Sequence, residues 1–146
     1  MPLVRPVLVA AAIVVATSTS ACKPKATLGT VDVGTRVGPK GALLPAATVD
    51  EAQYLGCDVR FENLREGDEI KIEWRWKRDE VNDKEWRTSK RETVKGTGNG
   101  TLRADLGSDT GEIDPGVWQC EFHVFAGERS VATADATGRI LVGRKD

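Results

Sequence analysis

Few residues in this 146-residue sequence have the types and spacing that catalysis or metal binding needs. The sequence contains one histidine, His123, which is expected on the outward face of the strand that carries Cys120. With no other histidine and no free cysteine, it lacks partners for a zinc site or a catalytic triad, and we expect a surface histidine. Asp109-Thr110-Gly111 matches the triplet of aspartic proteases, whose mechanism needs two carboxylates that share a proton. Here the triplet lies in a Gly/Asp-rich turn without a leading apolar strand, which favours turn chemistry. We therefore expect a protein that is not an enzyme and that uses no cofactor and no metal.

The charged residues are nearly balanced, with 21 Lys+Arg against 22 Asp+Glu. Nucleic-acid-binding domains usually show a strong basic excess or a one-sided basic cluster. This composition therefore predicts no nucleic-acid partner.

One charged block contains the best candidate for a binding site. Residues 71–95 hold nine basic and six acidic residues, and Trp86 lies in this block close to Arg87, Lys90 and Arg91. A surface tryptophan flanked by cations could contact a protein, a glycan or a lipid headgroup, because it offers a large stacking area. The alternative is a solvated sheet face, with Trp86 packed in the core or at its edge.

The N-terminal residues 1–21 are typical of a secretory signal peptide. Arg5 supplies the positive charge, and the apolar run at residues 7–16 would span about 15 Å as a helix, against a hydrocarbon core of about 30 Å. The run is too short to cross a membrane, and small residues follow it. We expect export of the chain and removal of this segment.

The end of the signal, Thr19-Ser20-Ala21-Cys22, resembles the lipobox of bacterial lipoproteins. The resemblance implies that Cys22 carries acyl chains, among them palmitate. It would then be the first residue of a membrane-anchored protein in the bacterial cell envelope. In that family, aspartate after the acylated cysteine marks retention in the inner membrane. Lys23 stands there instead, which implies the outer membrane, facing the periplasm or the cell surface. The alternative is an ordinary cleavage site with plain secretion.

If Cys22 is acylated, two cysteines remain free to pair in an oxidising compartment. We expect Cys57 and Cys120 to form a disulfide bond that closes a loop of 62 intervening residues. The chain-entropy model gives such a loop about 4 kcal/mol of stabilisation.

Apolar residues alternate with polar ones in several short segments, which predicts half-buried β-strands. The clearest alternations place Leu55, Cys57, Val59 and Phe61 on one face, and Ile70, Ile72, Trp74 and Trp76 on another. Further strands are expected at residues 30–37, as an edge strand, at 101–106 and at 118–124. Residues 131–142 are expected to form the last strand or a strand pair. Residues 78–95 are read as a polar connection. With no helical period over ten residues, the pattern predicts an all-β sandwich or barrel.

The run Asp114-Pro115-Gly116-Val117-Trp118-Gln119-Cys120 resembles the Asp-x-Gly-x-Tyr-x-Cys signature of immunoglobulin-like domains. Cys57 lies on an earlier core strand, and Trp74 or Trp76 follows it on what would be strand C. The resemblance implies an immunoglobulin-like β-sandwich of about seven strands at residues 30–146, behind a tether at 22–29. It implies nothing about a ligand.

Together these observations predict a lipid-anchored envelope protein that acts as a non-catalytic binding or structural module. Its expected partners are the membrane, through the anchor, and an envelope protein or glycan. The alternative is an inhibitor or accessory subunit of an envelope hydrolase or complex, acting through a protruding segment at residues 79–95.

Overall fold

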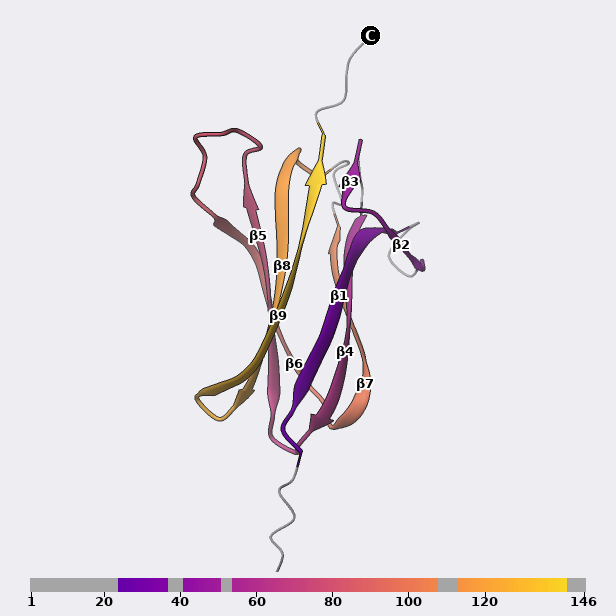
Figure 1. Ribbon diagram of the computed structural model, residues 1–146, viewed down its shortest axis with the longest axis vertical. Coiled ribbons are helices and arrows are strands. Elements are labelled where there is room, and N and C mark those ends of the chain that lie inside the picture. Colours follow the sequence, from indigo (N-terminus) through magenta and orange to yellow (C-terminus); the bar gives the residue numbers. More distant parts are fainter. Residues whose placement is uncertain (1–23, 37–40, 51–53, 108–112, 142–146) are drawn as a thin grey trace, which may run out of the picture.

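The alternating segments form two β-sheets that pack face to face, with their apolar sides inward (Figure 1). The computed structural model describes residues 24–36, 41–50, 54–107 and 113–141, and these contain no helix. One sheet has the strand order β2-β1-β4-β7 and the other β3-β9-β8-β5-β6. The strands are β1 (Thr27–Arg36), β2 (Leu43–Pro45), β3 (Thr48–Val49), β4 (Tyr54–Leu64), β5 (Glu69–Lys77), β6 (Arg87–Lys95), β7 (Gly98–Gly107), β8 (Gly116–Ala126) and β9 (Arg129–Ile140).

The expected immunoglobulin-like β-sandwich is confirmed by the strand order and by the residues at its centre. Cys57 on β4 and Cys120 on β8 come from opposite sheets, and Trp74 on β5 pairs in register with Cys120. All three are fully buried. In immunoglobulin domains a tyrosine two residues before the second cysteine bonds to the backbone upstream. Here Trp118 does so, because its Nε1 donates to the carbonyl oxygen of Asp114 at 2.9 Å.

The core follows the alternation of β5 and β8. Ile70, Ile72, Phe122 and Val124 are at most 1% exposed, whereas the residues between them point to solvent. Trp76 is only half-buried at the end of this row, where its Nε1 donates to the carbonyl oxygen of Pro115 at 3.0 Å. Both tryptophans of β5 therefore lie on the inner face, but only Trp74 is enclosed.

The described chain has nine strands, more than the seven expected. Strand β6 lies in the segment that we read as a polar connection. It is an edge strand paired only with β5, and Val94 is its one aliphatic side chain, so no apolar alternation marks it. Strands β2 and β3 are too short to show a period.

The first strand also differs from the expectation. It begins at Thr27, so the expected boundary between tether and domain at residue 30 falls inside β1. It is not an edge strand, because β2 pairs with it on the side away from β4. Ala26 is already buried, and Asn63 Nδ2 donates to the carbonyl oxygen of Lys25 at 3.4 Å.

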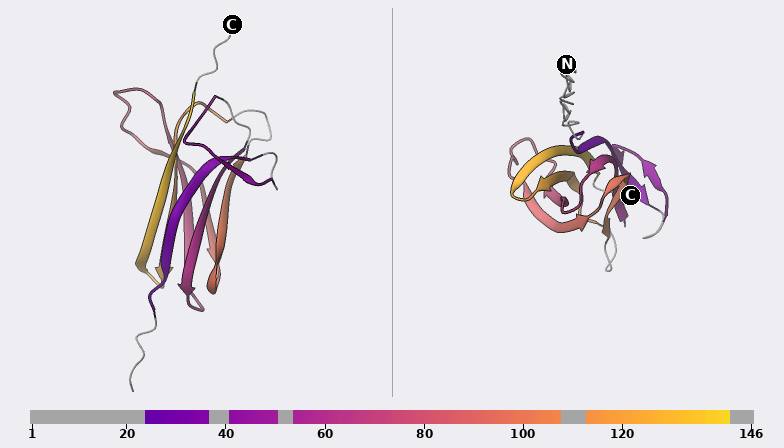
Figure 2. Two further views of the ribbon diagram at one scale, coloured as in Figure 1. Left: turned by 45° about the vertical axis from the view of Figure 1, so that its right-hand side comes forward. Right: turned by 90° about the horizontal axis from the view of Figure 1, so that it is seen from below.

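The loops gather at the two ends of the sandwich (Figures 1 and 2). The start of β1 lies at the same end as the β4–β5 turn, where the expected turn at residues 65–68 is closed by Asp68 N donating to Arg65 O at 3.0 Å. The β8–β9 turn, with Gly127 at φ 65°, lies there too. The loop between β5 and β6 and the end of β9 lie at the other end.

No helix long and apolar enough to cross a membrane occurs in the part of the chain that the structure describes. The expected signal peptide, the acylation site Cys22 and the triplet at residues 109–111 lie outside the described residues.

Candidate functional site

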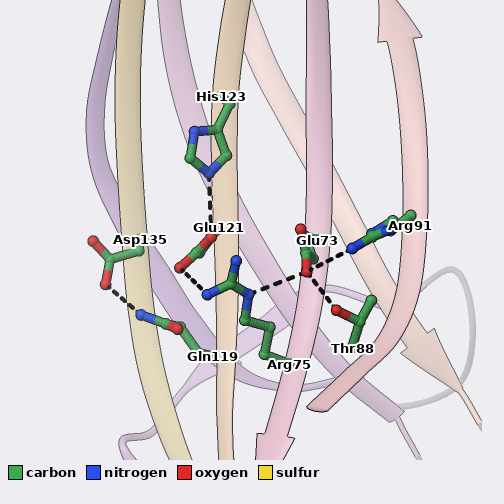
Figure 3. Close-up of polar contacts among 8 residues, drawn as sticks. All are labelled: Glu73, Arg75, Thr88, Arg91, Gln119, Glu121, His123 and Asp135. Atoms are coloured by element: carbon green, nitrogen blue, oxygen red, sulfur yellow. Dashed lines mark hydrogen bonds and ion pairs between the residues drawn. The ribbon is translucent and has the colours of Figure 1, made fainter. Parts of the chain in front are cut away.

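The outward-pointing side chains of β5, β6, β8 and β9 form a polar surface, which we call the outer face (Figure 3). Its middle is a row of three carboxylates on neighbouring strands: Asp135 pairs in register with Glu121, and Glu121 with Glu73. Arg91 of β6 completes this row beside Glu73. The sheet therefore holds carboxylates side by side, an arrangement that costs free energy unless cations offset it.

Arg75 provides this compensation. Its Nε lies 3.1 Å from Glu73 Oε1, and its Nη1 lies 3.4 Å from Glu121 Oε1. Figure 3 shows the guanidinium between the two carboxylates. One arginine thus joins the carboxylates of two strands and holds them in fixed positions.

Glu73 is the most highly connected group of the outer face. Thr88 Oγ1 donates to its Oε1 at 2.6 Å, and Arg91 Nη2 lies 3.5 Å from the same atom. The Thr88 hydrogen bond lowers the pKa of Glu73, and the bond to Arg75 adds to this against the opposing effect of burial. The carboxylate is therefore ionised at neutral pH.

An aromatic and a histidine continue the outer face toward the end where β1 begins. His123 Nε2 lies 3.2 Å from Glu121 Oε2, and the His123 and Phe125 rings are 6.3 Å apart. Lys71 Nζ lies 4.6 Å from the centre of the Phe125 ring. A hollow of about 530 Å³ opens here, lined by Lys71, Ile72, Glu73, Arg75, Arg91, Glu92, Thr93, His123 and Phe125. Its lining includes Phe125, Arg75 and Arg91, and aromatic and arginine side chains are enriched at protein interfaces.

The four residues proposed from the sequence as a binding site do not share one surface. Arg91 lies on the outer face, with its side chain 73% exposed. Lys90 lies on the inner side of β6, and its Nζ donates across the sandwich to the carbonyl oxygen of Asp105 on β7 at 3.0 Å. Lys90 is thus a link between the two sheets.

Trp86 is the last residue of the β5–β6 loop, residues 78–86, and Arg87 is the first residue of β6. The Arg87 guanidinium lies 5.4 Å from the Trp76 ring centre, and Lys77 Nζ lies 4.9 Å from the Trp86 ring centre. Trp86 is half-buried. The proposed site therefore contributes only Arg91 to the outer face. The residues that sequence reasoning missed are Lys71, Arg75 and Phe125, whose only signal was their outward position in the alternation.

One carboxylate organises the β5–β6 loop. Asp83 Oδ2 accepts from the backbone N–H of Arg78 at 2.9 Å and from Arg87 Nη1 at 3.1 Å, and Oδ1 accepts from the N–H of Glu85 at 3.2 Å. The backbone bond from Arg78 is the main cause that lowers the pKa of Asp83, followed by the bond from Arg87. The loop is therefore held in shape by its own residues.

Cys57 and Cys120 meet in the core as free thiols, so the structure does not contain the disulfide expected from the sequence. Burial raises the pKa of the Cys57 thiol strongly, and a hydrogen bond between the two thiols adds to the effect. The two cysteines lie within hydrogen-bonding reach of each other, and the disulfide stays a prediction.

Among the described residues no group of three or more His, Cys, Asp or Glu side chains is placed to hold a metal ion. The carboxylates of the outer face are bonded to Arg75, Thr88, Arg91, Gln119 and His123 instead.

Comparison with known proteins gives distant structural likenesses only. No family model and no curated protein matches the sequence. Among solved structures, a Bifidobacterium dentium β-glucuronidase complexed with coumarin-3-O-glucuronide is similar at 13% identity and a TM-score of 0.45, over 80% of this chain. This chain spans 17% of that enzyme's length. The N-terminal domain of PorA is similar at 15% identity and a TM-score of 0.25, over 78% of this chain and 99% of that domain.

Proposed function

We propose that this protein is a lipid-anchored bacterial envelope protein whose immunoglobulin-like domain is a non-catalytic module that binds another envelope protein through the outer face. The observation that supports the proposal most is the fixed network around Arg75, which holds charges of both signs in defined positions beside a hollow. Charges held in place before contact favour specific recognition, because little entropy is lost when a partner meets them.

A protein partner suits the outer face better than a glycan. Phe125 is the aromatic ring beside the hollow, and Lys71 already covers it. Around it lie charged side chains: Lys71 and Arg91 are exposed at the rim, and Arg91 Nη2 lies 3.5 Å from Glu73 Oε1. Charged groups at the rim of an interface govern the association rate and its salt dependence.

The anchor is supported by the resemblance of residues 19–22 to a lipobox and by the position of β1. Four residues separate Cys22 from Thr27, and fully extended they reach about 14 Å. An acylated Cys22 therefore keeps the sandwich close to the membrane, where the partner is also expected.

Capture from a solubilised envelope tests this function. The mature domain with Cys22→Ser serves as bait, beside a Lys71→Glu/Arg91→Glu variant and an Arg60→Glu control. Arg60 is exposed on β4, in the opposite sheet. We expect the wild type and Arg60→Glu to retain the same protein, and the double variant to retain at least tenfold less. Equal capture by all three baits contradicts the use of the outer face.

A second candidate function is that of an inhibitor or accessory subunit of an envelope hydrolase. The observation in its favour is the β5–β6 loop, which projects from the sandwich and is organised by Asp83 (Figure 1). Its test is the hydrolytic activity of envelope fractions with and without the added domain. A change that disappears when residues 79–85 are replaced by a short glycine linker supports this function, and no change contradicts it.

A further inference from the structure

The tip of the β5–β6 loop presents an isolated apolar side chain to solvent. Val81 is 94% exposed, the highest value among the large hydrophobic residues that the structure describes. The other two exposed residues of this class are Leu141 at 40% and Leu44 at 53%, and their segments lie at the same end of the sandwich (Figure 1). These exposed apolar residues therefore lie toward the end opposite the start of β1, but on different elements.

The loop is held at its tip and at its base. Asp83 N donates to the Glu80 carbonyl oxygen at 3.1 Å, which closes a turn with Val81 inside it. At the base, Asp79 Oδ2 lies 2.8 Å from Arg139 Nε of β9, which links the loop to a strand that is separated from β5 by β8. A loop ordered before binding loses little conformational entropy when it docks.

A hollow of about 550 Å³ lies beside the loop, so the surface has a convex and a concave part. It is lined by Arg78, Asp79, Glu80, Pro115, Gly116, Ile140 and Leu141. The partly exposed Leu141 is the large apolar side chain of this lining that reaches solvent. An apolar projection next to a shallow hollow matches a partner with a pocket and a raised rim.

The charges of the loop indicate the chemistry of that rim. Residues 78–86 carry four carboxylates and two cations. Asp79 and Asp83 are paired with arginines within this structure, whereas Glu80 and Glu85 are exposed on either side of the tip. The excess of carboxylates disfavours an anionic lipid surface and favours basic groups on a protein.

We infer that the β5–β6 loop is a second docking element, which inserts Val81 into an apolar pocket of a protein partner whose rim is basic. The inference rests on the proposed function as a binding module and adds a contact surface distinct from the outer face.

Site-specific photo-crosslinking in the cells that make the full-length protein tests this inference. A benzophenone amino acid replaces Asn82, which is exposed next to Val81. We expect one protein adduct on irradiation. Val81→Asp reduces its yield at least tenfold, and Val81→Ile changes it less than twofold. Glu80→Lys/Glu85→Lys reduces it at least threefold, whereas Lys84→Glu does not. Unchanged thermal unfolding midpoints show that each variant is folded.

Four results overturn the inference: no adduct, an adduct with lipid, an adduct with a second copy of this chain, or an adduct insensitive to Val81→Asp. The Lys71→Glu/Arg91→Glu variant separates this failure from failure of the proposed function. If that variant loses envelope capture and Val81→Asp keeps it, docking through the outer face is supported and docking through the loop is contradicted. If Val81→Asp loses the adduct and the outer-face variant keeps envelope capture, docking through the loop is supported and docking through the outer face is contradicted.

Discussion

Glu73 links the structure of the outer face to its dependence on pH. The pKa of Glu73 is lowered in the folded protein, so its bonds to Thr88 and Arg75 stabilise the fold above the unfolded pKa of about 4.3. This contribution is lost as the pH falls through the lower folded value. We expect Glu73→Gln to cost about 1 kcal/mol at pH 7 and progressively less as the pH is lowered to 3. Urea unfolding at both values measures this, and an equal cost at both pH values contradicts it.

The buried thiols of Cys57 and Cys120 lead to a prediction about the exported protein. An oxidising compartment should join two thiols that are already hydrogen-bonded to each other in the core. We expect protein purified from the envelope to have no reactive thiol on unfolding without reductant. Reduction should lower the free energy of unfolding by about 4 kcal/mol. Two titratable thiols in the freshly isolated, unfolded protein contradict the prediction.

At the scale of elements, three strands meet at a buried arginine on the outside of the four-stranded sheet. The Arg36 side chain of β1 is 1% exposed and binds Asp58 of β4 at 2.5 Å, as well as Asp105 of β7. Burial lowers the pKa of Arg36, but the hydrogen bonds and the charge attraction of Asp58 and Asp105 together outweigh this and raise it. Gly56 leaves room for the guanidinium, because a Cβ there would lie 2.4 Å from Arg36 Nε.

Gly56→Ala should therefore displace Arg36 from its carboxylates and cost about 2–3 kcal/mol of unfolding free energy. Gly29→Ala on β1 is the matched control, since its Cβ would meet atoms no closer than 3.6 Å. Thermal and urea unfolding of the two variants compare these costs. Equal stability of the two variants would show that the arginine is not confined by Gly56.

The predictable parts of the fold are those in which one face of a strand is apolar. Trp74 and Cys120 could be placed in the core because strict alternation in β5 and β8 leaves no other choice. Strand β6 could not be predicted from the sequence, since backbone hydrogen bonds to β5 hold it in the sheet. For the same reason the outer face stayed hidden: the meeting of Glu73, Glu121 and Arg75 depends on the register between strands, which no single strand encodes.

At the scale of the whole molecule, the proposed anchor and the proposed docking surfaces would lie in a defined order. The described chain starts at one end of the sandwich, and the β5–β6 loop lies at the other, with the outer face along the side between them (Figures 1 and 2). β5 has nine residues, so the loop lies about 30 Å beyond the end nearest the anchor. An acylated Cys22 thus directs the loop away from the membrane.

Cys22→Ala should remove the anchor without affecting the sandwich, which begins beyond it. We expect this variant to accumulate as uncleaved precursor or in the soluble fraction, with the unfolding midpoint of the domain unchanged. Fractionation and mass spectrometry of the N-terminus check the result. An unmodified N-terminal residue in the mature wild-type protein contradicts the lipid anchor.

Contact between the outer face and another protein is the claim on which the proposed function depends. Photo-crosslinking from Thr93, at the hollow of the outer face, and from Arg60, on the opposite sheet, measures it directly in intact cells. We predict a protein adduct from position 93 and none from position 60. No adduct from position 93, or equal adducts from both positions, would contradict a docking role for the outer face.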